Sequence, residues 1–217
     1  MAVNYPATFN VQKPEKFDRV QLALRVLVAI ILAIIAGAIG WLFGIVYLVL
    51  PVLAAIFVSQ KGAEKFLSED GPRMTGWIRW ILALYSYLAL LTDRFPTEKP
   101  EEIVHYEVTT GGEPTLGSAL LRLIYSIPSA LVLTLLAIVG AFIWIIAAVM
   151  VLVQEDYPEG LYNFNLGVMR WEARLLAYHS SLVDPYPPFS LDTGQEGAGA
   201  APTALGPEHS SASGGTE

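Results

Sequence analysis

The chain has 217 residues, of which 54% are hydrophobic and 15% are charged, and its formal net charge is -7. Together with a mean hydropathy of +0.50, this composition indicates an integral membrane protein rather than a soluble domain. The acidic balance gives no support for nucleic-acid binding, and the absence of cysteine excludes disulfides, thiolate metal sites and iron–sulfur clusters.

Two short stretches have the pattern of β-strands. Residues 5–11 and 105–110 alternate polar and apolar side chains, are rich in Tyr, Thr, Val and Phe, and are followed by Gly or Pro. We expect them to pair with each other on the cytoplasmic side of the membrane. Residues 1–17 are polar and contain two prolines, so we expect no cleaved signal peptide.

Two long runs, residues 26–60 and 123–154, contain no Asp, Glu, Lys or Arg. One helix over the first run would be about 52 Å long, against about 30 Å of hydrocarbon in a bilayer. Each run is therefore predicted to fold as a hairpin that turns at glycine, at Gly37, Gly40 or Gly44 in the first run and at Gly140 in the second. The four short transmembrane helices are predicted at residues 18–39, 44–60, 115–138 and 142–155. The last is short enough that a re-entrant hairpin is an alternative.

The segment after each apolar run is repeated, so that residues 79–96 return as residues 170–187. In the second copy, apolar side chains between residues 161 and 182 step by three and four, which predicts an amphipathic helix at the membrane interface. For the first copy, a fifth span over residues 74–92 is an alternative. The repeated positions are Gly76, Arg79, Trp80, Leu84, Tyr87, Leu91, Asp93 and Pro96, which return as Gly167, Arg170, Trp171, Leu175, Tyr178, Leu182, Asp184 and Pro187.

The basic residues predict the topology. All thirteen Lys and Arg lie outside the two apolar runs, and in a hairpin arrangement all of them fall on one side. The positive-inside rule then places both termini and the central connector in the cytoplasm. An even number of spans in each repeat keeps the two copies parallel, with a pseudo-two-fold axis along the membrane normal.

The second unit contains three characteristic stretches, Arg-Leu-Ile-Tyr-Ser-Ile-Pro at 122–128, Tyr-Pro-Glu-Gly-Leu-Tyr-Asn-Phe-Asn-Leu-Gly-Val-Met-Arg-Trp at 157–171 and Asp-Pro-Tyr-Pro-Pro-Phe at 184–189. Over nearly all of residues 103–191 it resembles the bacterial membrane-protein family called domain of unknown function four-three-eight-nine, and the first unit resembles a more diverged tandem copy. The resemblance implies short helix hairpins, each followed by an amphipathic helix, in the bacterial cytoplasmic (inner) membrane. It implies no established activity.

The predicted fold class is therefore an all-α integral membrane protein of two tandem helical-hairpin repeats, with interfacial amphipathic helices and a minor cytoplasmic strand pair. Residues 192–217 are rich in Gly, Ala, Ser, Thr and Pro, which predicts a disordered tail. The predicted domains are residues 1–97, 98–191 and 192–217.

The sequence contains no pattern typical of a catalytic, cofactor or metal site. His105, His179 and His209 have no partner at metal-ligand spacing, and no phosphate-binding loop or dinucleotide fingerprint occurs. We therefore expect no metal, no cofactor and no catalytic site. His179 is expected near the polar side of its helix, facing solvent or headgroups.

The repeated Arg-Trp pairs and the repeated Asp near each proline are the best candidates for contacts with lipid headgroups or partners. Trp favours the interface, and Arg reaches toward phosphate. Asp followed by proline also suits a purely structural helix end. Two symmetry-related sites for anionic lipid are the sharper alternative. The candidate residues are Arg79, Trp80, Asp93, Arg170, Trp171 and Asp184.

Three function classes are consistent with these features. A non-enzymatic accessory or scaffold subunit, bound to a larger membrane complex or to itself, fits best because its spans carry no charge and its loops are short. A small lipid-handling protein or transporter is the alternative, although such pathways usually contain ionisable residues at membrane depth. An enzyme is not expected, because no nucleophile, base or metal cluster assembles in the sequence.

Overall fold

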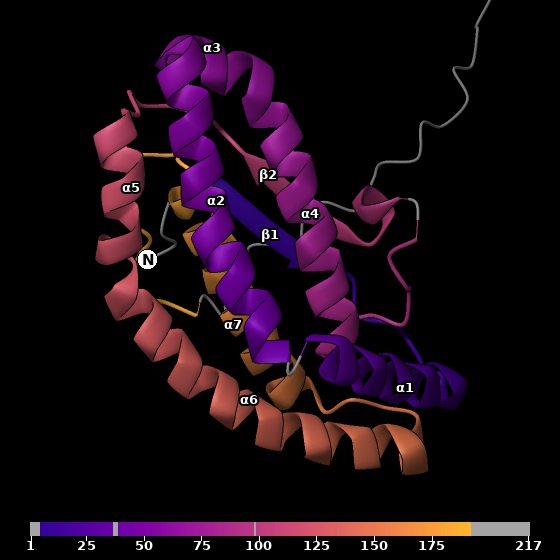
Figure 1. Ribbon diagram of the computed structural model, residues 1–217. Coiled ribbons are helices and arrows are strands. Elements are labelled where there is room, and N and C mark those ends of the chain that lie inside the picture. The colour runs from indigo at the N-terminus through magenta and orange to yellow at the C-terminus, as the bar shows by residue number, and fades with distance from the viewer. Residues whose placement is uncertain (1–4, 37–38, 98, 192–217) are drawn as a thin grey trace, which may run out of the picture.

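The computed structural model describes residues 5–36, 39–97 and 99–191. These residues form a mostly helical fold with one small antiparallel sheet (Figure 1). The predicted turn at Gly37 and the predicted tail, residues 192–217, lie outside the described residues.

The sheet contains β1 (Ala7–Val11) and β2 (Val104–Val108), which confirms the predicted pair of strands. Alternate side chains of both strands are buried, as their polar–apolar alternation predicts. The register pairs Ala7 with Val108 and Val11 with Val104, so that Phe9 faces Tyr106 at the centre.

The first apolar run forms two helices, α1 (Arg19–Ala36) and α2 (Ile39–Lys61). Gly40 and Gly44 lie inside α2, so the turn predicted at either glycine is wrong. A helix interior tolerates glycine at a cost of about 1 kcal/mol, which is much less than breaking helical hydrogen bonds in apolar surroundings.

The second apolar run does not form the predicted hairpin. Instead α5 (Leu116–Tyr125) is followed directly by α6 (Ile127–Gln154), a continuous helix of 28 residues that contains Gly140. The break falls at Ser126, just before Pro128, because a proline has no backbone N–H and is accepted in the first turn of a new helix. The helices predicted at 115–138 and 142–155 are therefore wrong in their division.

The repeated segment forms α4 (Gly71–Leu88) in the first half and α7 (Glu159–His179) in the second. A short helix, α3 (Ala63–Lys65), and a π-helical turn, η1 (Phe66–Asp70), precede α4, and a 3-10 turn, η2 (Pro100–Glu102), precedes β2. Most of α7 is buried, including polar residues that an interfacial helix would expose.

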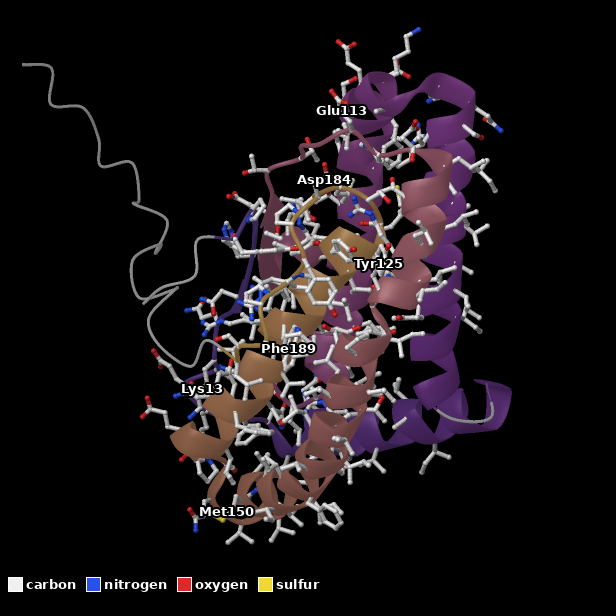
Figure 2. The ribbon with its side chains drawn as sticks, turned by 90° about the vertical axis from the view of Figure 1, so that its left-hand side faces the viewer. Lys13, Glu113, Tyr125, Met150, Asp184 and Phe189 are labelled. Carbon is white, nitrogen blue, oxygen red and sulfur yellow. The ribbon has the colours of Figure 1, made fainter. Side chains whose placement is uncertain are left out.

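The elements stack in layers, with the strands on one side, α7 and α4 next to them, and α1, α2, α5 and α6 outside (Figures 1 and 2). Contacts cross between the halves: β1 packs on α7 and β2 on α4, while α2 packs on α5 and α1 on α6. The two halves therefore form one interlocked body.

The outer layer exposes a large apolar surface. In α6, only Ser129, Leu133, Ala147 and Val151 are buried. Within the described part of the chain, two helices, α2 and α6, are long and apolar enough to cross a membrane. Large apolar side chains that are at least two-fifths exposed occur on all four outer helices, and include Val20, Leu27, Ile30, Leu48, Val52, Leu120, Ile124, Leu131, Leu135, Phe142, Ile145, Val149 and Val153.

Candidate functional site

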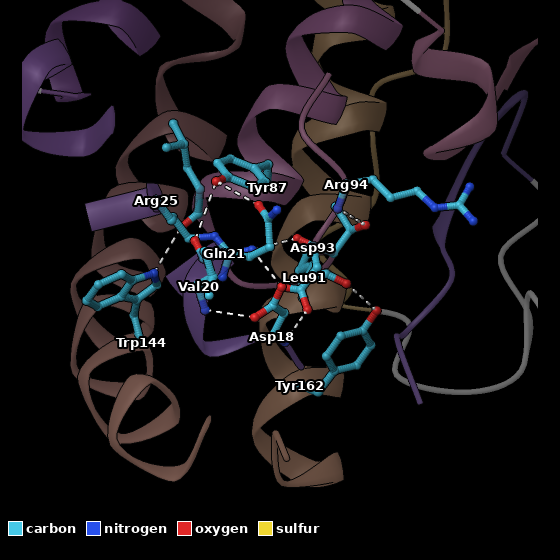
Figure 3. Close-up of polar contacts among 12 residues, drawn as sticks. Asp18, Val20, Gln21, Arg25, Tyr87, Leu91, Asp93, Arg94, Trp144 and Tyr162 are labelled. Carbon is cyan, nitrogen blue, oxygen red and sulfur yellow. Dashed lines mark hydrogen bonds and ion pairs between the residues drawn. The ribbon is translucent and has the colours of Figure 1, made fainter. Parts of the chain in front are cut away.

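Arg25 forms a buried arginine centre between α1 and the end of α4. Its Nη2 donates to the carbonyl of Thr92 at 2.7 Å and to Asp93 Oδ1 at 3.1 Å (Figure 3). The guanidinium also lies over the ring of Tyr87, 4.5 Å from its centroid. Asp93 Oδ2 accepts the backbone N–H of Asp18 at 2.8 Å. The carboxylate therefore links the start of α1 to the turn after α4.

Arg122 forms a second centre between α5 and the end of α7. Its Nη1 donates to the carbonyls of Tyr178, at 2.8 Å, and Val183, and its Nη2 donates to Asp184 Oδ1 at 2.6 Å. The guanidinium lies over the Tyr178 ring, again 4.5 Å from its centroid. Asp184 Oδ2 accepts the backbone N–H of Glu113 at 3.2 Å.

The two centres match group by group. Tyr87, Thr92 and Asp93 correspond to residues 91 positions later, whereas the arginines lie 97 positions apart. At the offset of 91 residues that relates the two repeated segments, the two aspartates align but the two arginines do not, because the arginines are displaced by six residues. The repeat pattern therefore predicts the aspartates as candidates and not the arginines.

The turns that carry the aspartates also match. Leu90 has φ 64° and Ser181 has φ 59°, and both are non-glycine residues in the left-handed region. Leu91 N donates to the carbonyl of Ser86, and Leu182 N donates to that of Ala177. Each helix therefore ends in the same closed turn, which presents backbone carbonyls to its arginine.

Arg79 and Arg170 make a second set of matched contacts, this time to the strands. Arg79 Nη2 donates to the carbonyl of Tyr106 at 2.8 Å, and Arg170 Nε donates to that of Phe9 at 3.4 Å. Arg170 Nη2 also donates to Asn10 Oδ1 at 3.1 Å. Each arginine therefore holds the central residue of the strand contributed by the other half.

The lipid-headgroup role of the six candidate residues stays a prediction, and the structure places most of them in contacts within the fold. Arg170 and Trp171 are buried, at 8% and 3% exposure, and Trp171 packs edge-on against Phe189. Trp80 is 45% exposed, although it occupies the position that corresponds to Trp171. The corresponding tryptophans of the two halves therefore differ in burial: Trp171 is buried and Trp80 is exposed.

His179 is fully buried, so the predicted position facing solvent or headgroups is wrong. Its Nδ1 lies 2.9 Å from Ser126 Oγ, and its Nε2 bonds the carbonyl of Tyr47. Burial lowers the pKa of His179 to about 4, so the imidazole is neutral near pH 7. A neutral imidazole can bond a carbonyl only as a donor, so Nε2 carries the proton and Nδ1 accepts from Ser126. Such a histidine is a weak general base at neutral pH.

Glu172 lies two helical turns before His179 on α7. Burial raises the pKa of its carboxyl group to about 7. The cause is desolvation, which disfavours the charged form of an acid. α7 therefore carries two titratable side chains, Glu172 and His179, whose pKa values are shifted in opposite directions.

A pocket of about 520 Å³ opens beside the Arg25 centre and is lined by Asp18, Asp93, Lys13, Lys16 and Arg94, among others. Its lysines already have partners, because Lys13 bonds the carbonyl of Tyr157 at 2.6 Å and Lys16 pairs with Glu155. In the part of the chain that the structure describes, no three His, Asp or Glu side chains gather as a metal site.

Residues 117–190 match the family described as Domain of unknown function (DUF4389), which confirms the resemblance for one copy, in the second half of the chain. Neither the curated proteins nor the solved structures give a match.

Proposed function

We propose that the protein is embedded in the bacterial inner membrane and acts as a non-enzymatic accessory or scaffold subunit, bound to a larger membrane complex or to further copies of itself. The observation that carries the proposal is the outer layer of α1, α2, α5 and α6, which exposes large apolar side chains along most of its length. A surface of this extent belongs in lipid or in an interface. By length and composition, α2 and α6 are the candidates among the described helices for crossing the membrane.

The positions of the charged side chains favour an accessory subunit over a transporter. Arg25 and Arg122 are buried, and each is paired with an aspartate and with at least one backbone carbonyl. These charges fasten helices together. Residues that conduct ions or solutes would instead face an open path.

We further propose that residues 1–97 are a tandem copy of the family unit matched in the second half. Support comes from the matched arginine centres, the matched turns at Leu90 and Ser181, and the strand register centred on Phe9 and Tyr106. The central residues of the two strands, Phe9 and Tyr106, pair with each other, so a two-fold rotation exchanges the strands, as expected for equivalent strands of two copies.

The test is purification of the tagged protein from its own membranes in a gentle detergent, followed by native mass spectrometry. A stoichiometric complex with another membrane protein, or a defined homo-oligomer, supports the accessory role. A monomer that retains one lipid species favours the lipid-handling alternative. Recovery in the soluble fraction after cell breakage overturns the membrane assignment.

A further inference from the structure

In the second half, an extended segment after α7 folds back onto that helix. This segment, residues 184–191, contains three prolines and two aromatic residues. Phe189 packs edge-on against Trp171 with ring centroids 5.1 Å apart, and Tyr186 packs against Tyr178 at 5.3 Å. Arg174 Nη2 donates to the carbonyl of Ser190, which fixes the backbone of the segment.

Gly167 marks the point where the segment crosses α7. A Cβ placed at Gly167 would lie 2.5 Å from the carbonyl oxygen of Leu191 and 2.9 Å from its Cβ. Glycine is therefore required by the close approach of the segment's backbone. Gly167 and Trp171, one helical turn apart, together form the surface of α7 on which this proline- and aromatic-rich segment packs.

In the first half, α4 has the same glycine and tryptophan surface, but no segment of the described chain packs on it. Gly76 and Trp80 stand at the corresponding positions of α4, but a Cβ at Gly76 would meet nothing within 4 Å. Trp80 is 45% exposed where Trp171 is 3% exposed, and Trp77 beside it is 43% exposed. No contact within the described part of the chain therefore accounts for a glycine at residue 76.

The occupant is missing because the chain takes a different path after the matched turn. Phe95 packs edge-on against Tyr87 at 5.1 Å, as Tyr186 does against Tyr178. The chain then continues through η2 to β2, which it must reach to pair with β1. It cannot also fold back along α4.

We propose that the Gly76–Trp80 face of α4 binds an extended proline- and aromatic-rich segment of a partner chain. The chemistry of the occupant is given by residues 184–191, which fill the corresponding face of α7. An aromatic ring of the partner packs edge-on against Trp80, and its backbone crosses the helix at Gly76. This inference rests on the proposed function, because it names the kind of partner that an accessory subunit would hold.

The test uses the full-length protein in detergent micelles and a labelled peptide with the sequence of residues 184–191, Asp-Pro-Tyr-Pro-Pro-Phe-Ser-Leu. We expect saturable binding by fluorescence anisotropy. Gly76→Leu fills the crossing point and Trp80→Ala removes the ring, so each should weaken binding by about tenfold or more. Gly44→Leu is the matched control, because Gly44 is also a glycine inside a helix with open space around it, and it should leave binding unchanged.

Absence of binding, or equal binding to wild type and Gly76→Leu, overturns the proposal. Equal binding would mean that the peptide displaces the internal segment on α7. Quenching of Trp80 by brominated lipid, with no peptide binding, would assign this face of α4 to the bilayer instead. The peptide assay needs only purified protein, so its failure leaves the complex detected by native mass spectrometry standing, and the reverse also holds.

Discussion

Replacing Gly167 by alanine should destabilise the protein relative to the same change at Gly76. Both glycines lie inside helices, so both changes gain about 1 kcal/mol of helix propensity. At residue 167 the new Cβ would also lie 2.5 Å from a backbone oxygen of Leu191, where ordinary van der Waals contact begins at 3.4 Å. Overpacking of this kind costs about 1–3 kcal/mol.

Because the chemical change is identical, the difference between the two variants isolates the clash. Gly76→Ala should be stabilised by about 1 kcal/mol. Gly167→Ala should lie about 1–3 kcal/mol below it in free energy of unfolding. For a domain of this size each kcal/mol shifts Tm by about 2–4 °C. The measurement is thermal unfolding of both variants in one detergent, followed by tryptophan fluorescence. Equal shifts in Tm would refute the close crossing of residues 184–191 over α7.

Three further predictions test the arginine centres and the buried titratable groups. Arg122→Met removes the donor from the carbonyls of Tyr178 and Val183 and the ion pair from the half-exposed Asp184, so it should lower the free energy of unfolding by about 1–3 kcal/mol. The matched change Arg25→Met should cost more, because the side chain of Asp93 is only 16% exposed; chemical unfolding measures both. In the wild type, His179 makes the free energy of unfolding fall as pH drops from 6.5 toward 4, because the imidazole is protonated in the unfolded chain and not in the folded protein. His179→Asn should abolish this contribution to the pH dependence. Glu172 has the opposite effect on the wild type: its carboxyl keeps its proton up to about pH 7 in the folded protein but loses it near 4.5 in the unfolded chain, so the free energy of unfolding falls as pH rises through this range. Glu172→Gln should abolish this contribution. The two terms oppose each other between pH 4.5 and 6.5, so each variant should show a steeper pH dependence of Tm than the wild type, with opposite signs; parallel profiles would contradict the burial of these groups.

The strands and the two repeated helices could be predicted from sequence because their signals are local. Alternation identified β1 and β2, and the three- and four-residue steps identified α7. The hairpin at Gly140 was wrong because glycine permits a turn without requiring one, whereas Pro128 limits where a helix can begin.

The burial of His179 and Trp171 could not be predicted, because it depends on elements distant in the sequence. His179 is covered by α2 and by Ser126 at the end of α5, and Trp171 is covered by Phe189. The arginine centres had a detectable signal, an Arg near the start of each apolar run. The six-residue difference in spacing separated them from the rest of the repeat.

The pairing of β1 with β2 and α7 affects how the protein forms during synthesis. β1 leaves the ribosome early, but its neighbours α7 and β2 are made only after the first two apolar helices and α4. Between the end of β2 and the end of α7 the ribosome needs roughly 4–15 s at about 5–20 residues per second. During that interval the apolar side of β1, with Phe9 at its centre, has no helix to cover it. The native contacts of β1 can therefore be completed only after α7 has been made.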